Sequence, residues 1–263
     1  QESMSVPRRV AILHYHLRPG GVSRVIEHAV TALLRRGIQA VVVTGTPASS
    51  CSMPAGTAVA VAGLNYAKPG VKTQPDRLRT RIETAVRRAL GGPPDLWHVH
   101  NHSLGKQPAL TETVRQWAAE GVPLLLQVHD FPEDGRSAAY RALRRDLAGG
   151  DPLRLSDALY PPGRRVHYAL LAKRDVTLLR AAGLPPSRLH WLSNPVDLPM
   201  SRHLNRRDPA GETPLLLYPT RAIRRKNLGE FLLWAACARD QARFAVSMSP
   251  IASSPERTRY EAW

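Results

Sequence analysis

The 263-residue chain is long enough for two domains of ordinary size, and its 43% hydrophobic content is typical of a globular protein with a core. No apolar run approaches the roughly 18 residues that a membrane-spanning helix needs, so we predict no such helix. The formal net charge of +16 would attract a phosphorylated small molecule, a lipid headgroup or nucleic acid, but charge alone does not choose among them, and a solvated basic surface is the simpler interpretation.

Buried strands alternate with amphipathic helices from the start of the chain. Residues 10–13 form a continuous apolar run, and apolar residues then recur at helical spacing over 22–34 before Gly37. A second buried strand over 39–44 completes a strand–helix–strand unit, which requires a parallel sheet. The same pattern predicts further strands at 58–62, 95–100, 122–128, 166–171 and 188–193. It predicts helices at 77–90, 108–119, 137–148 and 172–182, the third of them within a long excursion over 130–163.

The pattern therefore predicts an α/β protein whose first lobe, residues 1–195, is a doubly wound, Rossmann-like parallel sheet. A proline-rich, polar linker follows, and a second lobe begins with strands at 215–218 and 243–247 around a helix at 227–238. A single unit of about 50 residues cannot bury a core of its own. Either this unit packs against the first lobe, or the chain is a fragment of a longer protein. We expect the second, so that residues 196–263 are a linker with an incomplete second lobe.

The cysteines and the distribution of basic residues bear on the location and partners of the protein. Cys51 and Cys237 form no CxxC pair, which predicts a reducing, cytoplasmic environment without a disulfide framework. The basic residues are scattered in twos and are not interleaved with aromatic side chains, so we do not expect nucleic acid as the partner. Peripheral contact with an anionic membrane stays open. Residues 1–3 are expected to be an addition ahead of a natural Met4.

A glycine pair follows the first strand. Gly20 and Gly21 open the amphipathic helix, where the backbone can approach a ligand and the helix N-terminus offers N–H groups and partial positive charge to a phosphate. A plain tight turn is the alternative, because the GxGxxG spacing of dinucleotide folds is missing. After the first strand of the second lobe, Arg221 and Lys226 could bind a diphosphate, with a solvated basic turn as the alternative.

Histidines gather at the ends of two central strands. Alternation along one strand would place His98, His100 and His102 on one face, as in a metal site, but no cluster of Asp, Glu or Cys supplies a further ligand. We predict no metal and expect His100 and Asn101 to line a polar cleft. His129 follows the next strand toward the same cleft, where it could hydrogen-bond a substrate hydroxyl or move a proton, unless it is simply a satisfied loop histidine. The motifs of serine hydrolases and P-loop NTPases are absent.

Five short segments carry a family resemblance. They are HYHLRPGGV at 14–22, DLWHVHNH at 95–102, LQVHD at 126–130, SNPVD at 193–197, and YPTR at 218–221 continuing to KNL at 226–228. In order and spacing they resemble the retaining glycosyltransferases of the two-lobed GT-B fold, family 4.

The resemblance implies a role for each candidate residue. Gly20 and Gly21 would approach the diphosphate of a UDP- or GDP-linked sugar, and Arg221 and Lys226 would neutralise it. His129 would contact the transferred hexose, which would keep its anomeric configuration, and the reaction would need neither a metal nor another cofactor. The acceptor is not indicated, although the loops at 63–75 and 130–163 are expected to form its site.

The chain also departs from the family. Thr220 and Pro195 stand where family members often have glycine, and the second-lobe glutamate pair, E-x7-E, is absent. We therefore expect this chain to be inactive or nearly so, even if its parent is an enzyme. Two other functions stay open at this stage: a non-catalytic basic protein that binds nucleic acid or anionic membrane on the same scaffold, and a sugar-nucleotide epimerase of the GT-B fold.

Overall fold

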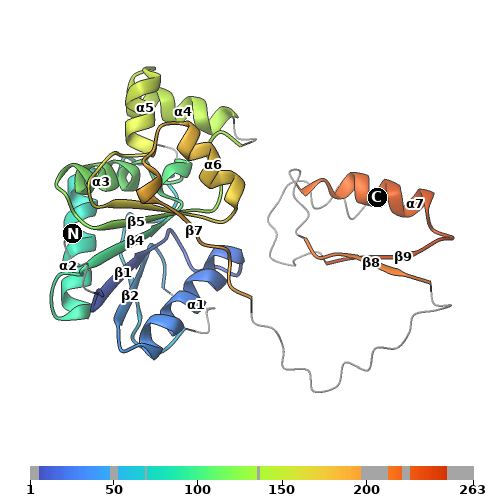
Figure 1. The fold of residues 1–263 in the computed structure, drawn as a ribbon, viewed down its shortest axis with the longest axis horizontal. Coiled ribbons are helices and arrows are strands. Elements are labelled where there is room, and N and C mark those ends of the chain that lie inside the picture. Colours follow the sequence, from blue (N-terminus) through green and yellow to red (C-terminus); the bar gives the residue numbers. More distant parts are fainter. Residues whose placement is uncertain are drawn as a thin grey trace. The chain divides into compact units, whose positions relative to one another are not determined.

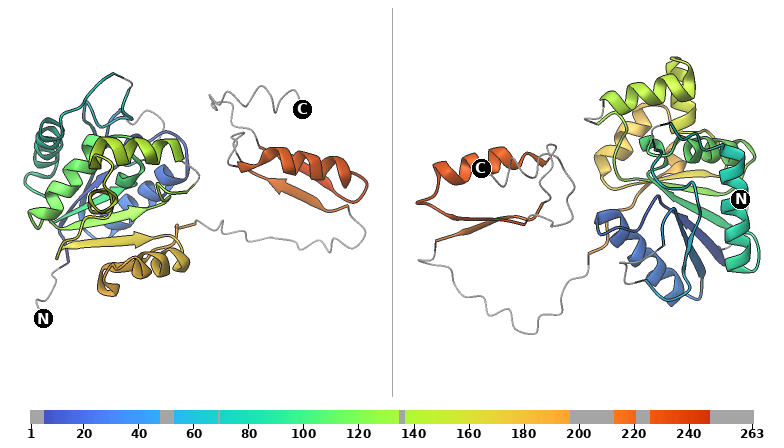
Figure 2. Two further views of the ribbon diagram at one scale, coloured as in Figure 1. Left: turned by 90° about the horizontal axis from the view of Figure 1, so that it is seen from above. Right: turned by 180° about the vertical axis from the view of Figure 1, so that it is seen from behind.

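The structure is a computed structural model that describes residues 6–47, 53–68, 70–134, 137–196, 213–220 and 226–247. The chain divides into two compact units, residues 1–197 and 198–263. In the first unit, strands and helices alternate along the chain and the helices flank one sheet (Figures 1 and 2). Within the described ranges, no helix is long and apolar enough to cross a membrane.

The strands of the first unit are β1 (Arg9–Leu13), β2 (Gln39–Thr44), β3 (Ala58–Ala60), β4 (Leu96–His100), β5 (Leu124–Val128), β6 (Val166–Leu170) and β7 (Leu189–Trp191). Its helices are α1 (Gly21–Arg35), α2 (Pro75–Leu90), α3 (Pro108–Ala119), α4 (Ser137–Ala148), α5 (Pro152–Leu159) and α6 (Lys173–Ala181). Two 3-10 turns are η1 (His102–Leu104) and η2 (Pro186–Arg188).

The sheet of the first unit has seven strands in the order β3-β2-β1-β4-β5-β6-β7, and every neighbouring pair is parallel. The chain moves outward from β1 to β3 and then returns to add β4 on the other side of β1. The predicted doubly wound α/β fold is therefore confirmed. Its topological switch point, where open α/β sheets bind their ligands, lies at the carboxyl ends of β1 and β4.

Burial on both faces explains why the strands are continuous apolar runs. On β1, Val10 and Ile12 pack into one core cluster with Ile26 and Val30 of α1. The residues between and after them, Ala11 and Leu13, belong to a second cluster with side chains of α2 and α3. Since neighbouring strand residues point to opposite faces, each face of the sheet has its own core.

The excursion at 130–163 holds one helix more than the sequence pattern predicted. Besides α4, the chain forms α5, which starts where the Asp151 carboxylate accepts hydrogen bonds from Leu153 N and Arg154 N. Pro152 occupies the first turn of this helix. Leu155 packs with α4 in a small core cluster of its own. The Asp-Pro pair is a known helix start, so the signal was present in the sequence.

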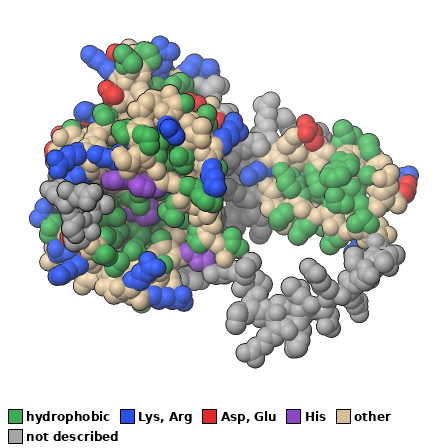
Figure 3. Space-filling view, viewed as in Figure 1, with side chains coloured by type: hydrophobic (Ala, Val, Ile, Leu, Met, Phe, Trp, Pro, Cys, Tyr) green, Lys and Arg blue, Asp and Glu red, His purple; other side chains and the backbone are tan. Residues whose placement is uncertain are grey.

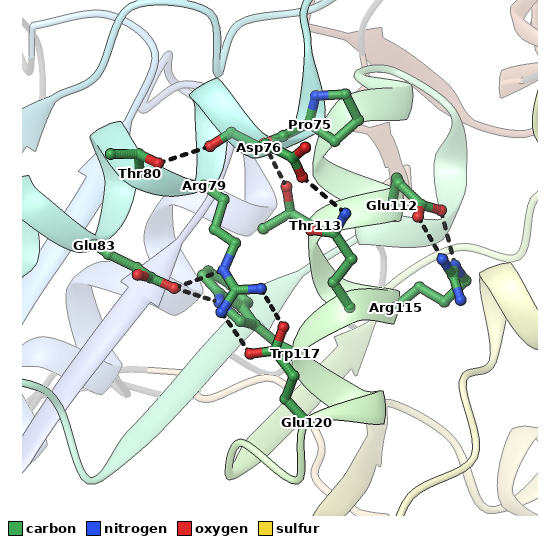
Figure 4. A network of polar contacts seen from close by, with 11 residues as sticks. Pro75, Asp76, Arg79, Thr80, Glu83, Glu112, Thr113, Arg115, Trp117 and Glu120 are labelled. Atoms are coloured by element: carbon green, nitrogen blue, oxygen red, sulfur yellow. Dashed lines mark hydrogen bonds and ion pairs between the residues drawn. The ribbon is translucent and has the colours of Figure 1, made fainter.

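A polar network joins α2 to α3 (Figure 4). The Arg79 guanidinium donates to Glu83 Oε1 at 2.9 Å on its own helix and also pairs with Glu120, just after α3. Trp117 Nε1 donates to Glu83 Oε1 at 2.8 Å, and the Trp117 ring stacks on Trp97 of β4 with 4.3 Å between centroids. Because these charged groups satisfy one another, the network holds two helices against the sheet and has a structural role.

The second unit, described by itself, contains strands β8 (Leu215–Tyr218) and β9 (Arg243–Val246), paired in parallel, and helix α7 (Leu228–Cys237) between them in sequence. The predicted strand–helix–strand order is confirmed. Phe231 of α7 packs against Tyr218 and Phe244, with ring centroids 5.0 and 5.6 Å apart. Leu215 and Leu217 of β8 remain 57% and 61% exposed, as expected for a two-stranded sheet covered by one helix.

Candidate functional site

Three histidines from three neighbouring strands meet at the carboxyl edge of the first sheet. His14 follows β1, His100 ends β4, and His129 follows β5. The rings of His14 and His100 have centroids 6.3 Å apart, and those of His100 and His129 lie 5.2 Å apart. Figure 3 shows histidine side chains together on one face of the first unit, with Lys and Arg side chains around them. The sequence-predicted residues His100 and His129 are thus brought together at the switch point.

His129 and His100 form a direct imidazole pair. His100 Nδ1 lies 2.9 Å from His129 Nε2 and the rings are stacked. Since both rings are neutral near pH 7, one of these nitrogens carries the proton and the other accepts it. If His100 donates, His129 keeps its own proton on Nδ1 and can donate from there. If His129 donates, its Nδ1 can only accept.

Asn101 braces this site through its backbone and its side chain. Its φ of 55° places it in the left-handed region, which Asn tolerates better than most residues. Asn101 Oδ1 accepts a 2.8 Å hydrogen bond from His129 N, and its carbonyl accepts one of 2.8 Å from the Tyr15 hydroxyl. The sequence pattern predicts that His100 and Asn101 line a polar cleft, and in the structure both side chains are buried, at 0% and 4% exposure. Both hold His129, which is only half-buried.

The expected alternation of three histidines on one strand face is wrong for His102. The left-handed turn at Asn101 ends β4, and His102 enters η1, where its Nε2 lies 2.8 Å from the Leu159 carbonyl oxygen. His98 does share a face with His100, and its Nε2 lies 2.8 Å from Gln127 Oε1. Among the described residues, no group of three or more His, Cys, Asp or Glu is placed to hold a metal ion.

Burial keeps the histidine cluster uncharged. Desolvation is the largest cause in every case, and it lowers the pKa of His14 to about 3 and that of His98, His102 and His129 to about 4. The pKa of His100 falls well below its ordinary value, first through burial and then through the neighbouring histidines. Neutral imidazoles can exchange hydrogen bonds with hydroxyl groups, but they supply no positive charge to a phosphate.

Three buried ring nitrogens among these histidines have no hydrogen-bond partner among the described residues, namely His14 Nδ1, His100 Nε2 and His102 Nδ1. Buried polar atoms in native proteins are nearly always paired with protein or ordered water. These nitrogens therefore keep a hydrogen-bonding capacity that a ligand hydroxyl or a water molecule could satisfy.

Gly20 and Gly21 lie at the start of α1, where no close neighbouring atom requires a residue without a side chain. Gly20 is the N-cap in an extended conformation (φ 166°), and in the described structure no side chain caps the helix and no acidic residue stands in its first turn. A Cβ at Gly20 would meet only Arg18 O, at 3.9 Å, and one at Gly21 would meet nothing within 4 Å. The space beside both glycines is therefore open, and the N–H groups of the first turn have no side-chain cap.

The second-unit candidates are only partly placed. Lys226 directly precedes Asn227, the left-handed N-cap of α7, and the Tyr218 hydroxyl donates to the Lys226 carbonyl. Lys226 is thus held near the end of β8, as the sequence predicted. Arg221 lies outside the described residues.

The sequence pattern missed a group of side chains next to the histidines. The ring of Tyr66 has its centroid 5.0 Å from that of His16 and 5.3 Å from that of Tyr15, and Lys106 Nζ lies 5.3 Å from its centre. Tyr15 and His16 could have been found from the sequence, because they follow β1 just as His129 follows β5. Nothing local in the sequence connects Tyr66 with Lys106, since their contact depends on how the loops after β3 and β4 meet.

The imidazole pair leads to a first prediction. In His100→Phe, His129 should lose its defined tautomer, because phenylalanine keeps the volume but offers Nε2 no partner. The ¹⁵N shifts of the His129 ring at about pH 7.5 should then move toward tautomer averaging. His100→Asn, which can place a polar atom near the former Nδ1, should restore much of the wild-type pattern, and His28→Gln on α1 should leave it unchanged. Identical His129 shifts in wild type and His100→Phe would contradict the pairing.

Comparison with known proteins gives one consistent family. Glycosyltransferase Family 4 matches residues 19–199. The chain is 26% identical over 256 residues to the mannosylglucosyl-3-phosphoglycerate synthase of Petrotoga mobilis, a match that covers 84% of this chain and 47% of the relative. The chain thus spans about half the length of that relative.

Solved structures agree on the fold. The glycotransferase of kitacinnamycin superposes with a TM-score of 0.51 at 14% identity, covering 97% of this chain and 69% of that one. The Anabaena protein Alr3699/HepE, solved in complex with UDP-glucose, gives 0.52 at 12% identity, covering 97% and 64%. At such low identity these likenesses show the fold alone, and they confirm the predicted GT-B-like α/β architecture.

Proposed function

The chain belongs to glycosyltransferase family 4, and from this premise we propose that the protein transfers a hexose from a nucleotide-diphosphate sugar to an acceptor hydroxyl, with retention of configuration. The observation that carries the proposal is His129, held at 2.9 Å by the buried His100 at the topological switch point of the sheet. A neutral imidazole in that position hydrogen-bonds a hydroxyl of the transferred sugar without attracting the anionic part of the donor.

The donor diphosphate is proposed to bind at the start of α1 and to the cations of the second unit. The open space around Gly20 and Gly21 and the uncapped helix N-terminus support the first contact. Arg221 and Lys226 would neutralise the diphosphate, Arg as a bidentate fork and Lys as a point charge. Side-chain cations would then take the place of a metal ion. The donor is UDP- or GDP-linked in this proposal, and the UDP-glucose complex of the Anabaena protein, which shares the fold, supports a donor of this class.

In the proposed reaction, the bond between the anomeric carbon and the diphosphate oxygen breaks, and the acceptor oxygen bonds to the same face of the sugar. The acceptor proton passes to the leaving diphosphate oxygen. Charge develops on that oxygen as the sugar becomes oxocarbenium-like, so stabilising the diphosphate is the main catalytic contribution. The activity is that of the whole protein. Because residues 196–263 contain no E-x7-E pair, we propose that the 263-residue chain alone has little or none of it.

A thermal-shift panel tests the donor proposal. UDP, GDP, ADP and their sugar conjugates are added to the 263-residue chain and to the longest natural protein that contains it. A UDP- or GDP-sugar at about a hundredfold excess over its Kd should stabilise the longer protein by about 2.7 kcal/mol, a Tm increase of roughly 5–10 °C.

Two further measurements, a thermal shift with DNA and product analysis with each nucleotide-sugar, separate the other functions. Stabilisation by DNA but by no nucleotide-sugar, with a steep dependence on salt, would replace the proposal with a nucleic-acid-binding protein. Conversion of a nucleotide-sugar without transfer to any acceptor would indicate an epimerase.

A further inference from the structure

Three segments at the carboxyl edge of the first sheet contain basic residues but no carboxylate. Residues 14–26 follow β1, residues 61–75 follow β3, and residues 101–111 follow β4, and none of the three includes an Asp or Glu. Their cations are Arg18, Arg24, Lys68, Lys72 and Lys106, of which Arg24 is paired with Glu27, just beyond the first segment, at 2.6 Å. The segment after β5 differs, since it carries Asp130, Glu133 and Asp134. The edge over β1, β3 and β4 is therefore suited to an anion, and the edge beyond β5 is not.

Within this region, Tyr66 and Lys106 form a defined pair. Lys106 Nζ lies over the Tyr66 ring, 5.3 Å from its centre, while the ring packs edge-on against His16 and Tyr15. Tyr66 remains 43% exposed. The ring thus holds an ammonium group close to a phenol hydroxyl at the surface, and both are hydrogen-bond donors. We call these two residues, with His16, the Tyr66–Lys106 platform.

The platform is held by hydrogen bonds from beneath. Ala67 N donates to the Lys106 carbonyl at 2.6 Å. The buried Gln107 donates through Nε2 to the carbonyls of Gly63, at 2.8 Å, and Asn65, at 3.0 Å. Asn65 Nδ2 in turn donates to Gly45 O at 2.7 Å. The loop after β3 is therefore fixed to the start of α3 and to the end of β2, so its donors are positioned before a ligand arrives.

The platform also adjoins the histidine site. Tyr15, which packs against Tyr66, donates its hydroxyl hydrogen bond to the Asn101 carbonyl, and Asn101 Oδ1 accepts from His129 N. A molecule seated on Tyr66 and Lys106 would therefore lie at the same edge of the sheet as His129 and would be connected to it through Tyr15 and Asn101.

From these contacts we propose that the Tyr66–Lys106 platform binds an anionic group of the acceptor, so that the acceptor is a sugar or polyol bearing a phosphate or a carboxylate. The inference rests on the proposed glycosyltransferase function. The donor diphosphate has its own proposed contacts at Gly20, Gly21 and the second unit, so we assign the platform, with the Lys106 ammonium, to a second anion. The ammonium supplies charge, and the phenol hydroxyl supplies a directed hydrogen bond.

The test is calorimetric titration of the 263-residue chain with glucose 6-phosphate, glucuronate and glucose. The anionic sugars should bind at least about tenfold more tightly than glucose, a difference of about 1.4 kcal/mol, and the preference should shrink as salt is added. The two anions separate phosphate from carboxylate as the recognised group. Lys106→Met should remove the preference, Lys106→Arg should retain most of it, and Tyr66→Phe should weaken it by a few fold.

Lys173→Met is the matched control, because Lys173 Nζ lies 4.6 Å from the Trp191 ring centre in a second lysine–aromatic pair near β7. It should leave the affinities unchanged. The proposal is overturned if glucose binds as well as the anionic sugars, if neither anion binds, if Lys106→Met behaves as wild type, or if UDP or GDP displaces glucose 6-phosphate competitively. Anion binding through Lys106 in a protein that ignores every nucleotide-sugar would instead refute the donor proposal and leave this site standing.

Discussion

Gly21→Trp should weaken nucleotide-sugar binding by about 100-fold or more, a loss of about 3 kcal/mol, while hardly changing stability. A side chain at Gly21 meets no protein atom within 4 Å of its Cβ, so the fold accepts it. The position is in the first turn of α1, where the indole would occupy the space in which we place the diphosphate. Titration with the donor found in the panel and urea denaturation measure the two effects separately.

Two other glycine variants serve as controls for this prediction. Gly21→Ala should cost little binding, because a methyl group fills little of the space. Gly45→Ala should behave in the opposite way, since its Cβ would lie 2.3 Å from Asn65 N and would destabilise the fold by about 1–3 kcal/mol. If Gly21→Trp binds the donor as wild type does, the diphosphate does not approach this loop.

Acidification should unfold the first unit between about pH 6.5 and pH 4. Burial lowers the pKa of His98, His102 and His129 from 6.5 to about 4 in the folded protein. In this interval the unfolded chain takes up protons that the folded chain cannot bind, so stability is complete above pH 6.5 and falls as the pH decreases. By about pH 4, protonation in the unfolded chain lowers the free energy of unfolding by on the order of 3 kcal/mol for each such histidine. Several histidines together match the roughly 5–15 kcal/mol by which a domain is stable.

Urea titrations at several pH values from about 7.5 to 4.5, followed by tryptophan fluorescence, measure this loss. His102→Asn should reduce the slope of stability against pH, because it removes one buried histidine outside the His100–His129 pair. His28→Gln should keep the wild-type slope. A midpoint that stays constant over this range would show that the histidines are not held neutral by the fold.

The sequence by itself determined the fold class and the order of most elements. Continuous apolar runs such as 10–13 are typical of strands buried on both faces, and they alternated with amphipathic helices closely enough to indicate a parallel sheet. The helix α5 was missed because it is only 8 residues long, too short for a helical repeat to be recognised, although Asp151 and Pro152 marked its start. The correctly predicted elements and the missed helix all depend on local periodicity and capping, which are signals between residues close together in the sequence.

Only the tertiary structure decided which residues meet and in what state. His14, His100 and His129 come together because β1, β4 and β5 are neighbours in the sheet although they are far apart in the chain. One left-handed residue, Asn101, separated His102 from His100, and the possible row of ligands His98, His100 and His102 instead makes three different contacts, with Gln127, His129 and the Leu159 carbonyl. Burial, which no residue pattern states, makes the cluster neutral, and the meeting of two loops places Lys106 over Tyr66. Spacing along the chain predicts elements, whereas strand order, register and desolvation arise only when those elements pack.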